Sequence, residues 1–410
     1  MKVMIRALAV MGLMAVALWV SSCGHFNCTR TFGASTCAAG GGAGGTKSGG
    51  NGTGGTGTAS AFVFTGALTA LESFTFSATG ADIFGTPNVT PVSAPDSNGG
   101  RSIVVQGKYL YASFYGLGLY SQIYGWTIGS DGSLTAISGS PFTVSNWTGT
   151  ILTPFATNPS GTMLFEADAG AVQGMSNVHS YLVGTGGVLT EAAGSPVSIP
   201  FSPGDTVMDG LGNYLYIVGI DGTGAGVEVG AYQVSSSGLL TAVPGSPFAY
   251  PMTQIAGDAS GKYLIGTTSG TADPHLYVFS IQTSGANAGA ITPVAGSPFV
   301  TQFSPYSIAV QPAGGEFVYS FSLNSSGSGN PIEGYQLNPS TGALTAVVGS
   351  PFTALTGQTG QFVQSGTYLF GLNGLTLTAY QGSSTGVLTS LATSASTLGF
   401  EPPTAVTDVP

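Results

Sequence analysis

Residues 132–142 read GSLTAISGSPF, and copies of this segment recur along the chain. The clear copies are GVLTEAAGSPV at 187–197, GLLTAVPGSPF at 238–248, GAITPVAGSPF at 289–299 and GALTAVVGSPF at 342–352, with a shorter GVLT at 386–389. A seventh, degenerate copy begins at Gly80. The copies are spaced by roughly 50 residues, and this interval lies within the range of β-propeller blades.

Each period holds short segments rich in β-branched and aromatic residues, with no helical periodicity. In the period at 305–352 we expect strands at 307–310, 316–322, 332–337 and 343–348. Four antiparallel strands in each of seven periods predict an all-β fold, a seven-bladed β-propeller.

Closure of the ring requires strands from both ends of the chain. The amino-terminal part, 61–92, supplies only three strands of the seventh blade, so we expect the tail at 402–407 to add the first strand. A pair of β-sandwich domains is the alternative fold. The unbroken period favours the propeller.

The first residues have the layout of a secretory signal. Lys2 and Arg6 come before an apolar run from Ala7 to Val20, which is shorter than a membrane-spanning helix. The sequence VSSC at 20–23 resembles a lipobox, which implies a signal peptide at 1–22 and acylation of Cys23. Ordinary cleavage, with Cys23 as a free thiol, is the alternative.

These features predict an exported lipoprotein that faces the periplasm or the cell surface. Gly24, and not Asp, follows Cys23. By resemblance to the enterobacterial sorting rule, this favours the outer membrane.

Residues 23–60 are expected to tether the propeller of residues 61–410. From Ala38 to Ser60 the chain is almost wholly Gly, Thr, Ser and Ala, which cannot bury enough apolar surface to fold. Cys28 and Cys37 form an even pair that can oxidise to a local disulfide. They lack the four ligands of a structural zinc, so no metal site is implied, and no motif calls for a cofactor.

The propeller domain is strongly acidic. It carries Arg101, Lys108 and Lys262 against all 17 acidic residues of the chain. Nucleic acid is therefore excluded as a partner, because its backbone demands clustered positive charge. We expect a monomer whose partner is a carbohydrate or another protein.

The strand before each repeated segment adds a resemblance to a known family. YLYAS at 109–113, YLYIV at 214–218, YLIGT at 263–267 and FVYSF at 317–321 precede the GxLT and GSPF elements. Together they resemble the lactonase-type seven-bladed propellers, which include 6-phosphogluconolactonase-like, muconate cycloisomerase-like and surface-layer tetrapeptide-repeat (YVTN-like) proteins. The resemblance covers residues 61–410 and implies their fold.

In propellers, the loops between the second and third strands share one face with the channel mouth, where ligands usually bind. The candidates for binding a neutral polar ligand on these loops are Tyr115, Tyr120, Asp168, Asp221 and Asp273. The alternative is an ordinary solvated loop, since the same residue types are common in turns.

Lactone hydrolysis would need a base that activates water and a donor for the oxyanion. His179 and His275 each open a third strand, with Glu166 and Glu228 near them in the sequence, and these four are the catalytic candidates. A structural role for each histidine is the alternative. The sequence therefore predicts a binding or interaction module, with a lactonase-like hydrolase of a sugar lactone as the alternative.

Overall fold

The computed structural model describes residues 61–408 with short gaps. The gaps are 68–69, 78–83, 85–86, 93–96, 117–121, 147–148, 153–154, 171–175, 225, 269–273, 312–315, 323–329, 356–360, 366, 374–375 and 396–400. The expected signal and tether, with Cys23, Cys28 and Cys37, and the degenerate repeat copy at Gly80 lie outside the described residues.

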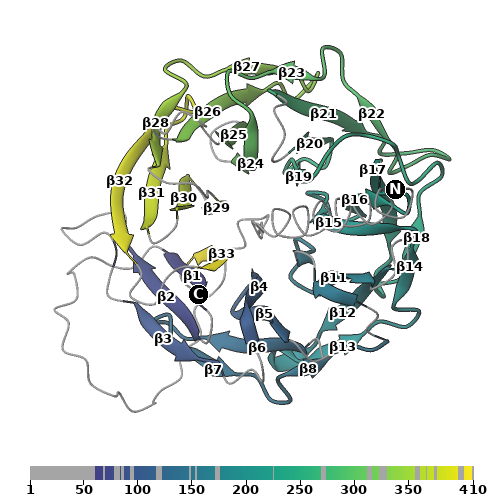
Figure 1. The fold of residues 1–410 in the computed structure, drawn as a ribbon, viewed down its shortest axis with the longest axis vertical. Helices are drawn as coiled ribbons and strands as arrows, with labels where there is room; N and C mark the ends of the chain where they lie inside the picture. Colours follow the sequence, from purple (N-terminus) through teal and green to yellow (C-terminus); the bar gives the residue numbers. More distant parts are fainter. Residues whose placement is uncertain are drawn as a thin grey trace, which may run out of the picture.

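Seven antiparallel sheets form a ring around a central axis, and each sheet has a path of four strands (Figure 1). The fold is therefore all-β and a seven-bladed propeller, as the repeats predict, and the β-sandwich alternative is wrong. A single 3₁₀ turn, η1 (Thr185–Gly187), is the only helix in the described part of the chain.

The first three blades take up residues 97–242. Blade 1 contains β4 (Ser97–Gln106), β5 (Tyr109–Gly116), β6 (Gln122–Ile128), β7 (Leu134–Ala136) and β8 (Phe142–Thr143). Blade 2 contains β9 (Gly149–Leu152), β10 (Ala156–Thr157), β11 (Met163–Gly170), β12 (Ser176–Val183), β13 (Leu189–Glu191) and β14 (Val197–Ile199). Blade 3 contains β15 (Phe201–Met208), β16 (Tyr214–Asp221), β17 (Val227–Val234) and β18 (Leu240–Ala242).

The next three blades take up residues 254–395. Blade 4 contains β19 (Gln254–Gly257), β20 (Tyr263–Thr267), β21 (His275–Ile281), β22 (Ile291–Pro293) and β23 (Phe299–Val300). Blade 5 contains β24 (Pro305–Gln311), β25 (Phe317–Ser322), β26 (Asn330–Leu337), β27 (Leu344–Ala346) and β28 (Phe352–Leu355). Blade 6 contains β29 (Gln361–Ser365), β30 (Tyr368–Asn373), β31 (Thr376–Gly382) and β32 (Leu388–Ala395).

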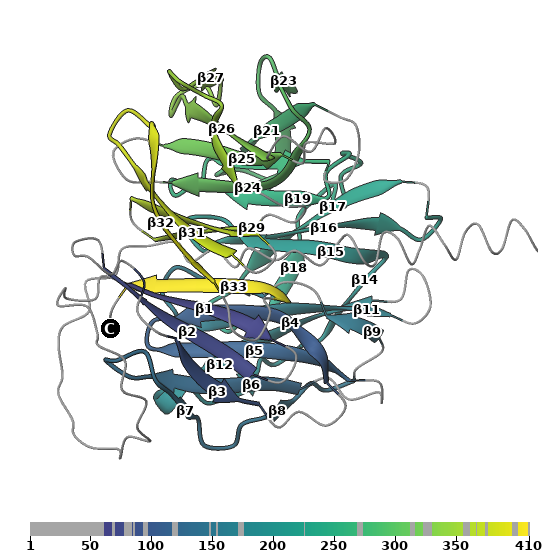
Figure 2. The ribbon, with the colours of Figure 1, turned by 60° about the vertical axis from the view of Figure 1, so that its left-hand side comes forward.

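Blade 7 joins the two ends of the described chain. It contains β33 (Glu401–Asp408), β1 (Ala61–Ala67), β2 (Ala70–Phe76) and β3 (Asn88–Pro91), in that order. Strand β33 lies beside β1 (Figure 2) and pairs with it antiparallel, with Ala61 opposite Asp408 and Val63 opposite Val406. The expected closure is confirmed, and it removes two open edges that would otherwise expose unpaired backbone groups.

The repeated Gly-Ser-Pro element folds the outer edge of five blades. Its serine hydroxyl accepts the backbone N–H of a residue in the third strand, at 2.9 to 3.0 Å. The pairs are Ser140 with Gly125, Ser195 with Ser180, Ser246 with Ala231, Ser297 with Val278 and Ser350 with Gly334. All five Ser–Pro bonds are cis.

After this turn the chain pairs again with the third strand, as β8, β14, β23 and β28, or as the single bridge between Phe248 and Val229. Blade 6 lacks the Gly-Ser-Pro sequence, and its outer strand β32 runs unbroken for 8 residues. The element therefore determines where the outer strand breaks.

The repeat glycine packs against the neighbouring blade. Gly187 has φ 80°, and a Cβ there would lie 2.6 Å from Cδ1 of Tyr109 in blade 1. A Cβ on Gly289 would lie 2.5 Å from Cδ1 of Tyr214 in blade 3. Real Cβ atoms do not come so close to other atoms, and the backbone at both positions is left-handed. Both positions therefore require glycine.

A tyrosine two residues further along the strand completes this contact. The Tyr111 hydroxyl donates a hydrogen bond to the Gly187 carbonyl at 2.6 Å. Tyr216 makes the same bond to Gly289 at 2.9 Å, and Tyr319 to Gly386 at 2.8 Å. The aromatic strand and the glycine turn, separated by more than 60 residues in the sequence, thus form one inter-blade joint.

Two adjacent glycines allow this joint to be tested. Gly186 and Gly187 both have positive φ, but a Cβ on Gly186 would meet nothing within 4 Å. We expect Gly186→Ala to lower the free energy of unfolding by about 1 kcal/mol, the ordinary cost of a left-handed alanine. Gly187→Ala should lower it by about 1 to 3 kcal/mol more, because Tyr109 must move. Denaturant unfolding measures both, and equal losses would contradict the joint.

Candidate functional site

Blade 2 carries a buried polar cluster formed by Glu166, Asp168, His179 and Glu191. Glu166 and Asp168 lie on β11, His179 on β12 and Glu191 on β13. The β11–β12 register places Glu166 opposite His179. Because side chains opposite one another in a sheet share a face, strand pairing alone brings these groups together.

The cluster faces blade 1. Leu164 and Tyr181 lie on the same face of blade 2 as Glu166, because side chains two residues apart in a strand share a face. Both belong to the core cluster that includes Tyr111 and Ile137 of blade 1. The polar groups are therefore placed at the seam between two blades, beside an apolar core.

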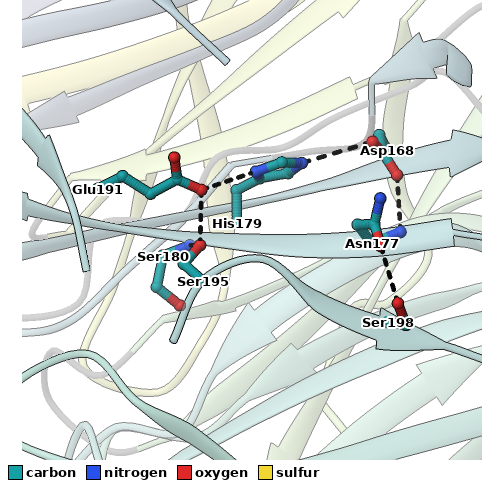
Figure 3. Close-up of polar contacts among 7 residues, drawn as sticks. All are labelled: Asp168, Asn177, His179, Ser180, Glu191, Ser195 and Ser198. Atoms are coloured by element: carbon teal, nitrogen blue, oxygen red, sulfur yellow. Dashed lines mark hydrogen bonds and ion pairs between the residues drawn. The ribbon is translucent and has the colours of Figure 1, made fainter. Parts of the chain in front are cut away.

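Each ring nitrogen of His179 faces a carboxylate oxygen (Figure 3). Nε2 lies 3.4 Å from Oδ2 of Asp168, and Nδ1 lies 3.2 Å from Oε1 of Glu191. The side chains of His179 and Asp168 are 0% exposed, and that of Glu191 is 22% exposed. The imidazole is thus sealed between two acids.

A second layer of hydrogen bonds holds the two carboxylates. Oδ1 of Asp168 accepts the backbone N–H of Asn177 at 2.6 Å. Oε1 of Glu191 accepts the Ser195 hydroxyl at 2.9 Å, and Ser195 is the serine of the repeated Gly-Ser-Pro turn. Ser198 in turn donates to the Asn177 side chain at 3.1 Å (Figure 3). The repeat turn therefore positions part of this cluster.

The pKa values of Glu166 and Glu191 are shifted in opposite directions. Both oxygens of Glu166 are buried without a hydrogen-bond partner among the described residues. Burial first, and then the charge of Asp168, raise the pKa of Glu166 well above its usual range. Burial also raises the pKa of Glu191, but hydrogen bonds from Ser145, His179 and Ser195 outweigh it and lower that pKa overall. Glu166 therefore favours the neutral acid and Glu191 the carboxylate.

The other candidates from the sequence are placed elsewhere. Asp221 ends β16, where its Oδ1 accepts the Thr223 backbone N–H at 2.9 Å and hydroxyl at 2.7 Å. Glu228 lies close by on β17, and its pKa is raised by partial burial and by the charge of Asp221. His275 opens β21 in blade 4, with its ring centroid 6.5 Å from that of Tyr277. Neither Glu228 nor His275 belongs to the blade 2 cluster.

Three ligand-binding candidates stay predictions. Tyr120 and Asp273 lie outside the described residues. Tyr115 belongs to β5 by its backbone, but its side chain is outside the described part. Asp168 is engaged with His179 and Asn177.

Glu191 and Ser195 did not emerge from the sequence as site residues, although a signal exists. The residue after the GxLT element is Ala136, Ala242, Pro293 or Ala346 in the other copies that carry the Gly-Ser-Pro turn. A glutamate at this place, in a chain with 6% charged residues, is an exception to the repeat. Comparing the copies position by position would have found it.

Two features are absent from the described ranges. No group of three or more His, Cys, Asp and Glu side chains there could hold a metal ion. Over the same ranges, no helix is long and apolar enough to cross a membrane.

No protein-family model and no curated protein sequence matches this chain. Solved structures do match it. A "putative 6-phosphogluconolactonase" from Bacteroides fragilis NCTC 9343 superposes with a TM-score of 0.61 at 14% identity, covering 85% of this chain and 98% of that chain.

A second "putative 6-phosphogluconolactonase", from Bacteroides uniformis ATCC 8492, gives a TM-score of 0.59 at 16% identity over 86% of this chain and 99% of its own. A protein from Lactobacillus plantarum gives 0.60 at 14% identity, with 85% and 99% covered. The chain has the lactonase-type propeller fold. At such identities, the likeness of this propeller to those proteins concerns the fold alone.

The raised pKa of Glu166 predicts a pH-dependent stability of the propeller. A buried acid with a raised pKa stabilises the fold fully below its unfolded pKa, and this contribution is lost as pH rises through the folded one. Glu166→Gln removes that titration. We expect the melting temperature of the parent to fall relative to Glu166→Gln as the pH rises above the ordinary pKa of a glutamate.

Calorimetric melting at a series of pH values measures this difference. Glu228→Gln is the control, because that carboxyl is only half-buried and its substitution should change the pH dependence less. A constant offset between Glu166→Gln and the parent at every pH would show that Glu166 does not titrate in this way.

Proposed function

We propose that this protein is an exported, lipid-anchored β-propeller that acts as a binding or interaction module for another protein or for a neutral polar ligand such as a carbohydrate. One observation carries the choice of binding over catalysis. The side chains of His179 and Asp168, whose Nε2 and Oδ2 atoms lie 3.4 Å apart, are both 0% exposed. A general base must come within hydrogen-bond reach of a substrate, and a sealed imidazole does not.

The distribution of positive charge supports the same choice. Arg101 and Lys108 belong to blade 1 and Lys262 to blade 4. Recognition of a phosphate requires clustered Arg or Lys side chains or a nest of backbone amides. An acidic ring with its cations spread between two blades therefore does not favour a phosphorylated sugar lactone as its substrate.

Hydrolysis of an uncharged sugar lactone is the second candidate. The fold shared with two proteins described as putative 6-phosphogluconolactonases favours it. In that case His275 is the better base, because it opens a third strand beside a ligand-face loop and is partly exposed.

Export and anchoring rest on the amino-terminal sequence. The positive start, the apolar run and VSSC at 20–23 support acylation of Cys23, and the Gly-rich tether would hold the ring away from the lipid. Gly24 supports the outer membrane. The proposed protein is a monomer that faces the periplasm or the cell surface.

Substitution of one cysteine tests the anchor. We expect Cys23→Ala to move the protein from the membrane fraction to the soluble fraction, because no acyl chain can then be attached. Cys28→Ala is the matched control and should remain with the membrane. Cell fractionation followed by mass spectrometry of the amino-terminal peptide gives the readout, and a Cys23→Ala protein retained at the parental level would refute lipidation.

Two assays separate binding from hydrolysis. We expect background turnover of gluconolactone and of its 6-phosphate, followed by proton release in dilute buffer. On glycan arrays we expect saturable binding that Tyr115→Ala or Tyr120→Ala abolishes. Leu211→Ala is the control, because this residue is 57% exposed in the turn between the first and second strands, at the opposite end of its blade.

Turnover above background that disappears in His275→Ala would replace the binding module with the hydrolase. If the protein shows neither turnover nor glycan binding, the proposed partner is another protein. Cross-linking through the same loops on intact cells would then identify it.

A further inference from the structure

The connection from blade 4 to blade 5, residues 301–304, runs from β23 to β24 (Figure 1). The Thr301 N–H donates to the Pro274 carbonyl at 2.8 Å, at the place where the loop between the second and third strands of blade 4 ends. Directly after the connection, Pro305 pairs with Ser322, where the corresponding loop of blade 5 begins. The connection therefore lies between two ligand-face loops.

One buried carboxylate holds the backbone of this connection. Glu333 on β26 is 3% exposed. Its Oε1 accepts the backbone N–H of Gln302 at 2.8 Å, and its Oε2 accepts that of Phe303 at 3.2 Å. The Tyr335 hydroxyl donates to Oε1 at 2.9 Å, and the Thr301 hydroxyl donates to the Phe303 carbonyl at 2.6 Å. Three donors thus offset the cost of burying the carboxylate, and two consecutive peptide groups are fixed.

Glu333 is an exception to the repeat. It comes directly before Gly334, whose N–H donates to the repeat serine Ser350. In the other four blades with this turn, the same place is taken by Tyr124, His179, Gly230 and Tyr277. None of these four is an acid, so the packing of a blade does not require a carboxylate here. The function of Glu333 is instead to be sought in the connection that it holds.

The fixed segment offers solvent one amide and one aromatic side chain. Gln302 is exposed and Phe303 is partly exposed. Sugar-binding sites need such a pair, because an aromatic ring packs against the apolar face of a sugar ring and an amide both donates to and accepts from hydroxyl groups. Since the backbone is already held, binding costs less conformational entropy. Neither side chain is charged, so the pair fits a neutral sugar.

We propose that Gln302 and Phe303 contact the neutral sugar that the propeller binds, and that Glu333 is the positioning residue that holds them in place. This inference rests on the proposed function and adds a contact segment to it. The segment belongs to a connection between blades, whereas the other candidates lie on or beside the loops within blades.

Substitution of the two contact residues tests the site. On an array of neutral oligosaccharides, we expect Phe303→Ala and Gln302→Ala each to raise the half-saturating concentration about tenfold or more. Phe248→Ala and Gln233→Ala are the matched controls and should bind like the parent. Phe248 is partly exposed at the outer edge of blade 3, and Gln233 is exposed at the end of β17 that faces away from the ligand-face loops.

The outcomes separate this inference from the proposed function. If the parent binds an oligosaccharide and both Phe303→Ala and Gln302→Ala bind it equally well, the contact segment is wrong and the proposed function stands. Loss of binding in Tyr115→Ala alone would then place the site at blade 1. A parent that binds no neutral oligosaccharide refutes the carbohydrate form of the proposed function, and this inference is refuted with it.

Glu333→Gln tests the positioning role. The amide has a single acceptor oxygen, and its NH₂ would face a peptide N–H, so one of the two backbone bonds is lost. We expect weaker binding of the same array oligosaccharides and faster hydrogen exchange of the Gln302 and Phe303 amides, measured by mass spectrometry. Ser350→Ala is the control, because it removes the bond to Gly334 and should lower stability without changing the affinity.

Unchanged affinity in Glu333→Gln, with the protein folded, would refute the positioning role. If Glu333→Gln does not fold, Phe303→Ala and Gln302→Ala still decide whether the connection contacts the sugar.

Discussion

The joint between the aromatic second strand of one blade and the repeat glycine of the next is the contact on which the ring depends. A blade is only four strands wide, and it buries its faces only against its neighbours. The cores accordingly lie between blades, as where Phe62 and Leu71 of blade 7 pack with Ile103 of blade 1. Gly187 lets the chain approach Tyr109 so closely that a single methyl group would disturb it. The joint therefore sets the spacing of the blades as well as their adhesion.

The same joint explains why the ring needs both chain ends. Each blade is covered by the blades on its two sides, so a blade without its inner strand would leave an open edge in the ring. Strand β33 fills this place by pairing with β1, although the two are more than 300 residues apart in the sequence. Closure is thus a long-range backbone contact that supports the packing between neighbouring blades.

Blade 2 departs from the pattern in a place where apolar packing would be expected. Glu166 and His179 occupy buried strand positions, and Glu191 follows a turn where the other Gly-Ser-Pro copies have alanine or proline. Buried charges are costly unless they are paired, and in this cluster each ring nitrogen of His179 faces a carboxylate oxygen. An exception of this kind indicates a role other than simple packing.

The sequence by itself determined the architecture, because the repeat carries turn residues whose backbone demands are local. Glycines with positive φ, the Ser–Pro turn and alternating apolar strands recur with one period, and period and copy number together define a seven-bladed ring. The missing strand of blade 7 could be inferred by the same counting. The sequence could also identify Glu166, Asp168 and His179 as candidates.

Only the tertiary structure decided what those candidates can do. Their accessibility depends on the neighbouring blade, which covers them, and on strand register, which turns Glu166 and His179 to the same face. Glu191 joins them through the third strand and the outer strand, a pairing that no local pattern encodes. How deeply each side chain is buried, and which charged groups surround it, are properties of the assembled ring. The chemistry of this site was therefore determined by packing, while the fold was determined by the repeat.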